Sequence, residues 1–159
     1  MTDGNRPLTP YYEGWDAYNN YLIEAVGNLT DEQLLHLNSP SQRPVWLLAA
    51  HIVGARLYWL TTVAGEAIPS SAPFLAWDED GDPLYTGAEI ANGLRASWDL
   101  IAAVLDRWTT STMDQTYTTV RGYVCTRQWI IWHLIEHDLH HGGELFYTLG
   151  ANGVQVPDW

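Results

Sequence analysis

The sequence carries little positive charge and almost no cysteine. Its 159 residues include no lysine and seven arginines against 19 acidic residues, so the formal net charge is −12. Because phosphate backbones and anionic lipid headgroups repel a chain of this charge, we expect it to bind neither nucleic acid nor a membrane surface. The single cysteine, Cys125, excludes a disulfide framework.

Long apolar runs and a leader segment are missing too. No stretch reaches the roughly 18 uninterrupted apolar residues of a membrane span. The first ten residues, MTDGNRPLTP, lack the basic start and apolar run of a signal peptide. We therefore expect a cytoplasmic protein. The acidic run of Asp78, Glu79, Asp80 and Asp82 lacks the order of an EF-hand, which favours a solvated loop over a calcium site.

Aromatic residues are abundant, with nine tryptophans and nine tyrosines. Such side chains bury large areas, and we assign them mainly to the core and to the walls of a pocket. The length fits one domain, and no repeat or linker divides the chain, so we expect a single domain over residues 1–159.

Helix signals dominate the hydrophobic pattern. Apolar residues recur at three- and four-residue spacing in four segments, 10–29, 44–63, 86–108 and 126–149. Thr30–Gln33 and Thr86–Glu89 are typical of capping boxes, and Gly150 is placed to end the last helix. The connections 64–85 and 109–125 are long and are expected to be irregular or weakly extended. Together these features indicate an all-α fold, a four-helix bundle.

Five of the six histidines lie on two predicted helices. His137 and His141 are four residues apart, so their side chains project side by side and can converge on one ion. His133 and His140 fall on the same side of that helix, and the four could line one cavity. His51 is the natural candidate for a third ligand, because it is the one histidine in the apolar helix 44–63.

The same histidines are also compatible with roles that involve no metal. A lone histidine in an apolar helix, such as His51, is commonly a hydrogen-bonded core residue, and a dense histidine cluster can be a surface feature. A zinc protease is disfavoured, because the residue after His137 is Asp138 rather than the glutamate of that motif. Tyr58, seven residues after His51, falls on the same helix face and could share the cavity.

Three segments resemble the DinB/YfiT-like family. The stretch Trp129–Leu145, WIIWHLIEHDLHHGGEL, resembles its C-terminal signature, in which two histidines four residues apart precede a basic-or-small residue, Gly, and Gln or Glu. Trp46–Val53, followed by Tyr58–Leu60, resembles the motif of its second helix. Leu29–Leu34 agrees with the end of its first helical region. The resemblance covers nearly the whole chain, with the motifs in the expected order.

This resemblance implies an up-down-down-up four-helix bundle, often a homodimer, with metal ligands at His51, His137 and His141 and an exchangeable coordination position. His133, His140, Tyr58 and Glu144 are then expected around the ligands or in the pocket. The sequence departs from the common pattern at Gly142, where many relatives have Arg, and at Glu144, where many have Gln. These departures put the role of that Arg in doubt and leave the ligands in place.

Family members include S-transferases that use thiols such as bacillithiol or mycothiol, and a mycothiol-dependent maleylpyruvate isomerase. The resemblance therefore implies a metal-dependent thiol S-transferase acting on a small molecule. A non-catalytic metal- or ligand-binding protein and a metal-dependent hydrolase stay open as alternatives. Imidazole ligands suit zinc or nickel, and also iron, manganese or copper, so the sequence does not name the ion.

Overall fold

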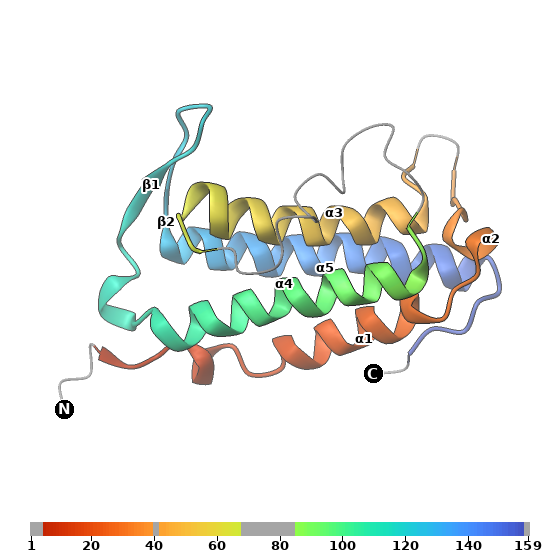
Figure 1. Ribbon diagram of the computed structural model, residues 1–159, viewed down its shortest axis with the longest axis horizontal. Coiled ribbons are helices and arrows are strands. Elements are labelled where there is room, and N and C mark those ends of the chain that lie inside the picture. Colours follow the sequence, from red (N-terminus) through yellow and green to blue (C-terminus); the bar gives the residue numbers. More distant parts are fainter. Residues whose placement is uncertain (1–4, 40–41, 68–84, 158–159) are drawn as a thin grey trace.

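A computed structural model describes residues 5–39, 42–67 and 85–157 of the chain. Four long helices form the body: α1 (Trp15–Gly27), α3 (Val45–Leu57), α4 (Gly87–Arg107) and α5 (Arg127–Ala151). In Figure 1, α1 and α5 run in one direction while α3 and α4 run in the other, which is the up-down-down-up order. The prediction of an all-α four-helix bundle is confirmed. The acidic run at residues 78–82 lies outside the described residues.

Packing among the four helices is uneven. α1 packs along α4, and α3 packs against both α4 and α5, whereas the backbones of α1 and α5 lie further apart and the two helices meet mainly through side chains. A continuous apolar core fills the space between the helices, and it includes nearly all of the apolar side chains of α3. Because α3 is buried on most sides, any polar side chain that it carries must find a partner within the bundle.

The helix starts follow the capping signals in two of three cases. The short helix α2 (Asp31–Leu34) and helix α4 each begin with a complete capping box, at Thr30 and Thr86, as predicted. The first helix does not start at Pro10. Residues Thr9–Tyr11 form the 3-10 turn η2, and Gly14, with φ +96°, is the left-handed N-cap residue of α1. Only glycine adopts this left-handed backbone without strain.

The second and the last long helix differ in detail from their predicted forms. Helix α3 continues beyond Leu57 as a turn of π-helix, η3 (Tyr58–Val63), so the predicted helix 44–63 is one element with a change of winding. The last helix extends through Gly150 to Ala151, and the glycine with positive φ is Gly153, at +76°. The helix therefore ends one residue after Gly150, and the left-handed glycine that follows it lies three residues later than expected.

The connection 109–125 is more ordered than its threonine-rich composition predicts. It holds the 3-10 turn η5 (Thr110–Thr112) and an antiparallel hairpin of β1 (Thr116–Thr118) and β2 (Val124–Thr126). The hairpin projects beyond the end of the bundle next to η3 (Figure 1). Thr126 caps the N-terminus of α5 by accepting a hydrogen bond from the backbone N–H of Trp129. None of the described helices has the length and apolar character needed to cross a membrane.

Candidate metal centre

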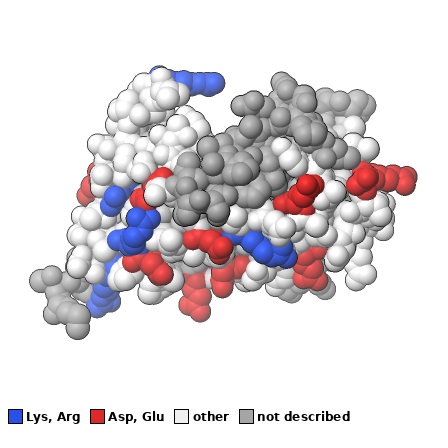
Figure 2. Space-filling model, in the orientation of Figure 1, with Lys and Arg blue, Asp and Glu red and all other residues white. Residues whose placement is uncertain are grey.

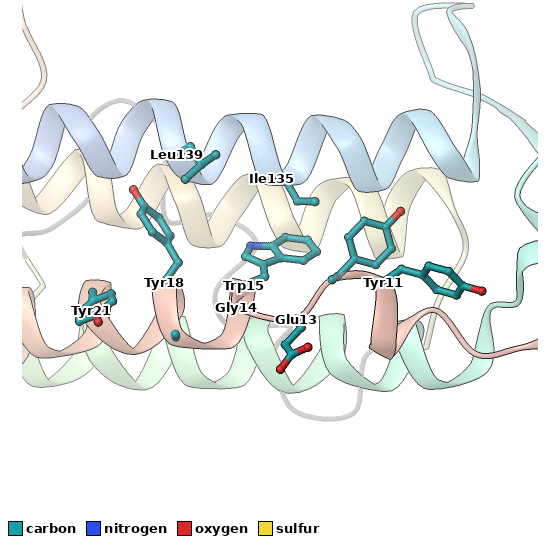
Figure 3. Close-up of a pocket in the computed structure, with 10 residues that line it drawn as sticks. Tyr11, Glu13, Gly14, Trp15, Tyr18, Tyr21, Ile135 and Leu139 are labelled. Carbon is teal, nitrogen blue, oxygen red and sulfur yellow. The ribbon is translucent and has the colours of Figure 1, made fainter. Parts of the chain in front are cut away.

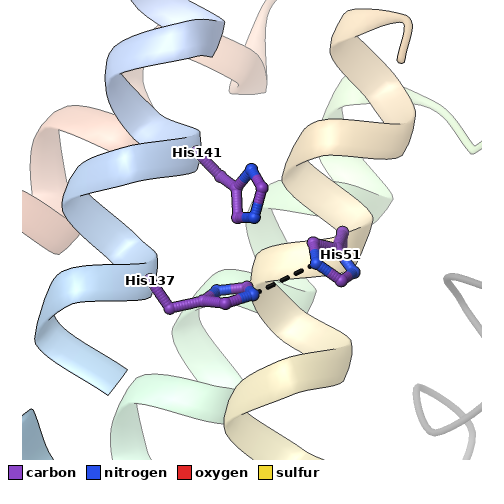
Figure 4. Close-up of side chains that lie close together, drawn as sticks. All are labelled: His51, His137 and His141. Carbon is purple, nitrogen blue, oxygen red and sulfur yellow. Dashed lines mark hydrogen bonds between the residues drawn. The ribbon is translucent and has the colours of Figure 1, made fainter. Parts of the chain in front are cut away.

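Three histidines meet at the seam between α3 and α5. Figure 4 shows His51 on α3 facing His137 and His141, which lie one turn apart on α5. The two Nε2 atoms of His51 and His137 are 3.1 Å apart, and one ring nitrogen from each of the three residues lies within 4.8 Å of the others. The structure thus brings together the three residues that the resemblance named as ligands.

Burial keeps two of these imidazoles neutral. Desolvation, helped by the neighbouring imidazoles, lowers the pKa of His137 to about 3. Burial also lowers the pKa of His141, although the Glu144 carboxylate opposes this shift. A neutral imidazole has a lone pair available for an ion, so both rings are in the form that a metal requires at neutral pH. The Nδ1 atom of His137 is buried without a hydrogen-bond partner among the described residues.

Glu144 contacts the site through His141. Its Oε2 lies 2.7 Å from Nδ1 of His141, an arrangement that fixes the ring and leaves Nε2 for an ion. His140 is exposed on the outside of α5, and its Nε2 lies 3.9 Å from the same carboxylate. His140, His141 and Glu144 form a second group with metal-ligating atoms close together, but this group is more exposed and shares His141 with the first.

His133 lies one turn before His137 and belongs to an aromatic cluster. Its ring stacks on Trp129, with centroids 4.7 Å apart, and meets the edge of Trp59 at 5.0 Å. The His133 and His137 centroids are 5.7 Å apart. Burial lowers the pKa of His133 as well. Tyr58 lines a hollow beside this cluster, together with Trp59 and Trp129. His133 and Tyr58 thus extend the site along the seam.

A second polar cluster, which the sequence patterns did not predict, lies on the other side of α5. Arg56 of α3 and Asp138 of α5 form a salt bridge, with Nη2 and Oδ2 2.7 Å apart and both side chains almost fully buried. Trp15 of α1 donates from Nε1 to the same carboxylate oxygen at 2.8 Å. Nε of Arg56 also donates to Asp138, at 3.0 Å, and Nη1 donates to Asn19 of α1 at 2.8 Å and to Ser97 of α4 at 3.2 Å. This cluster therefore ties all four helices together.

A signal for this cluster is present in the sequence. Arg56 is the one charged residue between Val45 and Val63, a segment that is otherwise mostly apolar. A charge in the middle of a buried helix requires an ionic partner, which predicts an acidic residue on another helix. In the sequence, Asp138 takes the place of the glutamate of the zinc-protease motif, and that comparison gives no indication of the salt bridge with Arg56. The burial of Asp138 against Arg56 removes it from any acid–base role at the histidines.

Gly142 has a structural role here. A Cβ atom at this position would collide with the hydroxyl of Tyr18, which packs against α5 from α1. Burial and the nearby Asp138 carboxylate raise the pKa of Tyr18 to about 12, so the phenol stays protonated. The Arg that many relatives have at this position would require Tyr18 to move. Tyr18 and Gly142 therefore form one matched pair in this chain.

A separate hollow of about 440 Å³ lies between α1 and α5. Figure 3 shows Trp15 and Tyr18 of α1 pointing toward Ile135 and Leu139 of α5, with Tyr11 and Tyr21 at the two ends. The outer face of α5 next to it exposes apolar side chains, including Leu139 at 53%. The predicted homodimer could use this face, and it stays a prediction.

Comparison with known proteins agrees with the sequence motifs. A family model described as the DinB superfamily matches residues 15–145. The chain belongs to the DinB superfamily. The match includes all three histidines, the whole of α3 and most of α5. No protein of curated function matches the chain.

Solved DinB-like structures share the fold. A DinB-like protein from Bacillus cereus ATCC 10987 superposes with a TM-score of 0.77 at 20% identity, over 98% of this chain and 99% of that one. A DinB-like protein from Bacillus subtilis gives a TM-score of 0.60 at 16% identity, over 89% and 90% of the two chains. At these identities the likeness establishes the bundle. The chemistry of this DinB-superfamily protein has to be argued from its own residues.

Proposed function

We propose that this protein binds one divalent metal ion through His51, His137 and His141 and transfers a low-molecular-weight thiol to an electrophilic small molecule. The observation that carries the proposal is the convergence of three ring nitrogens from two helices within 4.8 Å of one another. Zinc or nickel is the expected ion, and iron, manganese and copper also accept imidazole ligands.

The dimensions of the cluster support an ion. Metal–nitrogen bonds of about 2.0–2.1 Å separate two tetrahedral ligands by roughly 3.4 Å. The 3.1 Å between Nε2 of His51 and Nε2 of His137 is close to this value. The three ring nitrogens lie within 4.8 Å of one another, so the rings would have to draw closer together around an ion. The lowered pKa values of His137 and His141 mean that no proton has to leave these rings when the ion binds at neutral pH.

Three protein ligands leave one position for a small molecule, which is typical of catalytic rather than structural ions. A divalent ion at this position lowers the pKa of a thiol, so it would supply a thiolate near neutral pH. Glu144 holds the His141 ring in place. The stacked rings of Trp129 and His133, with Trp59 against them, provide an apolar wall where an electrophile can lie out of water.

The proposal can be tested with 1-chloro-2,4-dinitrobenzene and a panel of bacterial thiols. In the transfer, the thiolate sulfur bonds to the ring carbon, chloride leaves with the bonding electron pair, and the thiol proton passes to solvent. We expect untagged wild-type protein to hold about one metal ion per chain by elemental analysis, and to accelerate the reaction with at least one thiol. His137→Ala should lose both properties, whereas His140→Ala, an exposed neighbour on the same helix, should keep them.

The same experiment separates the alternatives. Equal, low metal content in wild type and His137→Ala would overturn the metal site itself. Metal binding without turnover for any thiol would favour a non-catalytic binding protein. Turnover of an ester substrate without added thiol would favour a hydrolase. In both of the last two cases the site stands and the transferase assignment fails.

A further inference from the structure

A hollow of about 630 Å³ lies at one end of the α3–α5 seam, between the start of η3, the start of α5 and the hairpin. The helices contribute three aromatic side chains to its lining, those of Tyr58, Trp59 and Trp129, and the hairpin contributes Thr119, Val120, Arg121 and Tyr123. Its surface is therefore mainly apolar and aromatic.

An unbroken row of rings connects this hollow to the histidine cluster. Trp129, His133, His137 and His141 follow one another at four-residue intervals and share one face of α5. Successive ring centroids along this row are 4.7, 5.7 and 4.5 Å apart. Trp59 covers the row from η3, with its centroid 5.0 Å from that of Trp129. The row places the hollow two rings away from His137 along the seam.

Arg121 is the one charged residue that lines the hollow, and it differs from the other arginines around the seam. Arg56 is buried against Asp138, Arg107 pairs with Glu66, and Arg127 stacks over Trp108. No ion pair joins Arg121 to an acidic residue of the described ranges. Figure 2 shows positive charge at the tip of the hairpin, apart from the acidic groups on the body. In a chain of net charge −12, an uncompensated arginine beside an aromatic hollow is suited to an anion.

We infer that this hollow binds the substrate as an anion: a flat apolar body lies against the contacting rings of Trp59, Trp129 and Tyr123, and a carboxylate at its far end pairs with Arg121. This inference rests on the proposed function, which assigns the reactive end of the substrate to the histidine cluster. The apolar walls account for affinity, since stacked aromatic contacts add to the area buried. Arg121 accounts for selectivity, because a guanidinium binds a carboxylate and gains little from a neutral amide.

A binding experiment without turnover tests the inference. The probes are 2-naphthoate and its neutral analogue 2-naphthamide, titrated by equilibrium dialysis into the full-length protein with no thiol present. We expect wild type to bind the carboxylate about fivefold more tightly, the upper range for an exposed ion pair. Arg121→Gln should remove this preference and leave naphthamide binding unchanged. Arg95→Gln, an exposed arginine on α4, is the matched control and should behave as wild type.

A second variant tests the aromatic wall. Tyr123 is half exposed on the hairpin, so Tyr123→Ala is expected to fold, and it should weaken both probes about threefold to tenfold without changing their ratio. Equal binding of the two probes by wild type, a preference that survives Arg121→Gln, or no binding of either probe would each overturn the inference.

The two proposals fail separately. Loss of the carboxylate preference in Arg121→Gln alongside no thiol-dependent turnover would retain the anion site and reject the transferase. Turnover that depends on His137, with no preference for naphthoate, would retain the transferase and reject the anion site.

Discussion

His137 and Asp138 are neighbours on α5, yet they belong to two polar clusters of opposite character. Asp138 is completely buried, and its carboxylate accepts hydrogen bonds from Arg56 and Trp15, so its polar atoms are satisfied within the protein. His137 is 9% exposed, its Nδ1 has no partner among the described residues, and its Nε2 faces another imidazole. The polar atoms of the first cluster are satisfied by one another, whereas the second cluster is the one for which we propose an ion.

This difference indicates how the bundle separates stability from function. A turn of about 100° between consecutive residues directs Asp138 toward Trp15 of α1 and Arg56 of α3, and His137 toward His51 of α3. The Arg56–Asp138 pair fixes the height of α3 relative to α5, and His51 lies about one and a half turns from Arg56 on the same helix. The salt bridge thereby positions the histidines without taking part in their chemistry.

Removal of one member of the buried pair should give the largest effect. Asp138→Ala leaves Arg56 charged and unpaired in the core, and we expect it to lower the free energy of unfolding by about 3–5 kcal/mol. The double variant Asp138→Leu with Arg56→Leu should lose less, because no buried charge remains. Urea denaturation measures both. A cost below about 1 kcal/mol for Asp138→Ala would mean that the cluster does not hold the helices together.

Metal binding at the histidine cluster should change the free energy of unfolding by a smaller amount. Zinc at 100 times its dissociation constant is expected to raise the free energy of unfolding of wild type by about 2.7 kcal/mol, because it binds the folded chain. In His137→Ala the same zinc concentration should give almost no change. Thermal denaturation with zinc, with nickel and with a chelator provides the comparison. Equal stabilisation of the two proteins would place the ion elsewhere.

The stability of the metal-free protein should also depend on pH, with a small change for each pH unit. The pKa of His137 is about 3 in the fold and about 6.5 in the unfolded chain, so below pH 6.5 the unfolded state binds a proton that the folded state does not. The free energy of unfolding should therefore decrease as the pH falls from 6.5 toward 3, by at most about 1.4 kcal/mol per pH unit from this residue.

His137→Gln provides the control for this dependence, because it removes the titrating group and keeps a polar side chain. Its stability should change less steeply between about pH 4 and 6.5 in urea titrations with chelator present. The lowered pKa of His141 acts in the same direction, so some slope should remain in the variant. An identical slope in both proteins would show that His137 is not the group that responds.

Local sequence patterns predicted most of the fold because their causes are local. The capping boxes at Thr30 and Thr86 depend on contacts three residues apart, and the pairing of His137 with His141 depends on the pitch of a helix. The start of α1 could not be predicted in this way. Thr9 and Pro10 resemble a helix start, but the Thr9 hydroxyl donates to Asp106 of α4, and α1 begins only after the left-handed N-cap Gly14.

The same distinction between local and long-range causes applies to the candidate site. The sequence by itself determined that two imidazoles would lie on one helix face, and that a third histidine and a single arginine would lie within an apolar helix. Only the tertiary structure decided that His51 meets His137 while Arg56 meets Asp138, because partners from different helices depend on the rotation and height at which those helices pack. It also decided that the hairpin carries Arg121 to the end of the aromatic seam, since a contact between residues far apart in sequence leaves no local pattern.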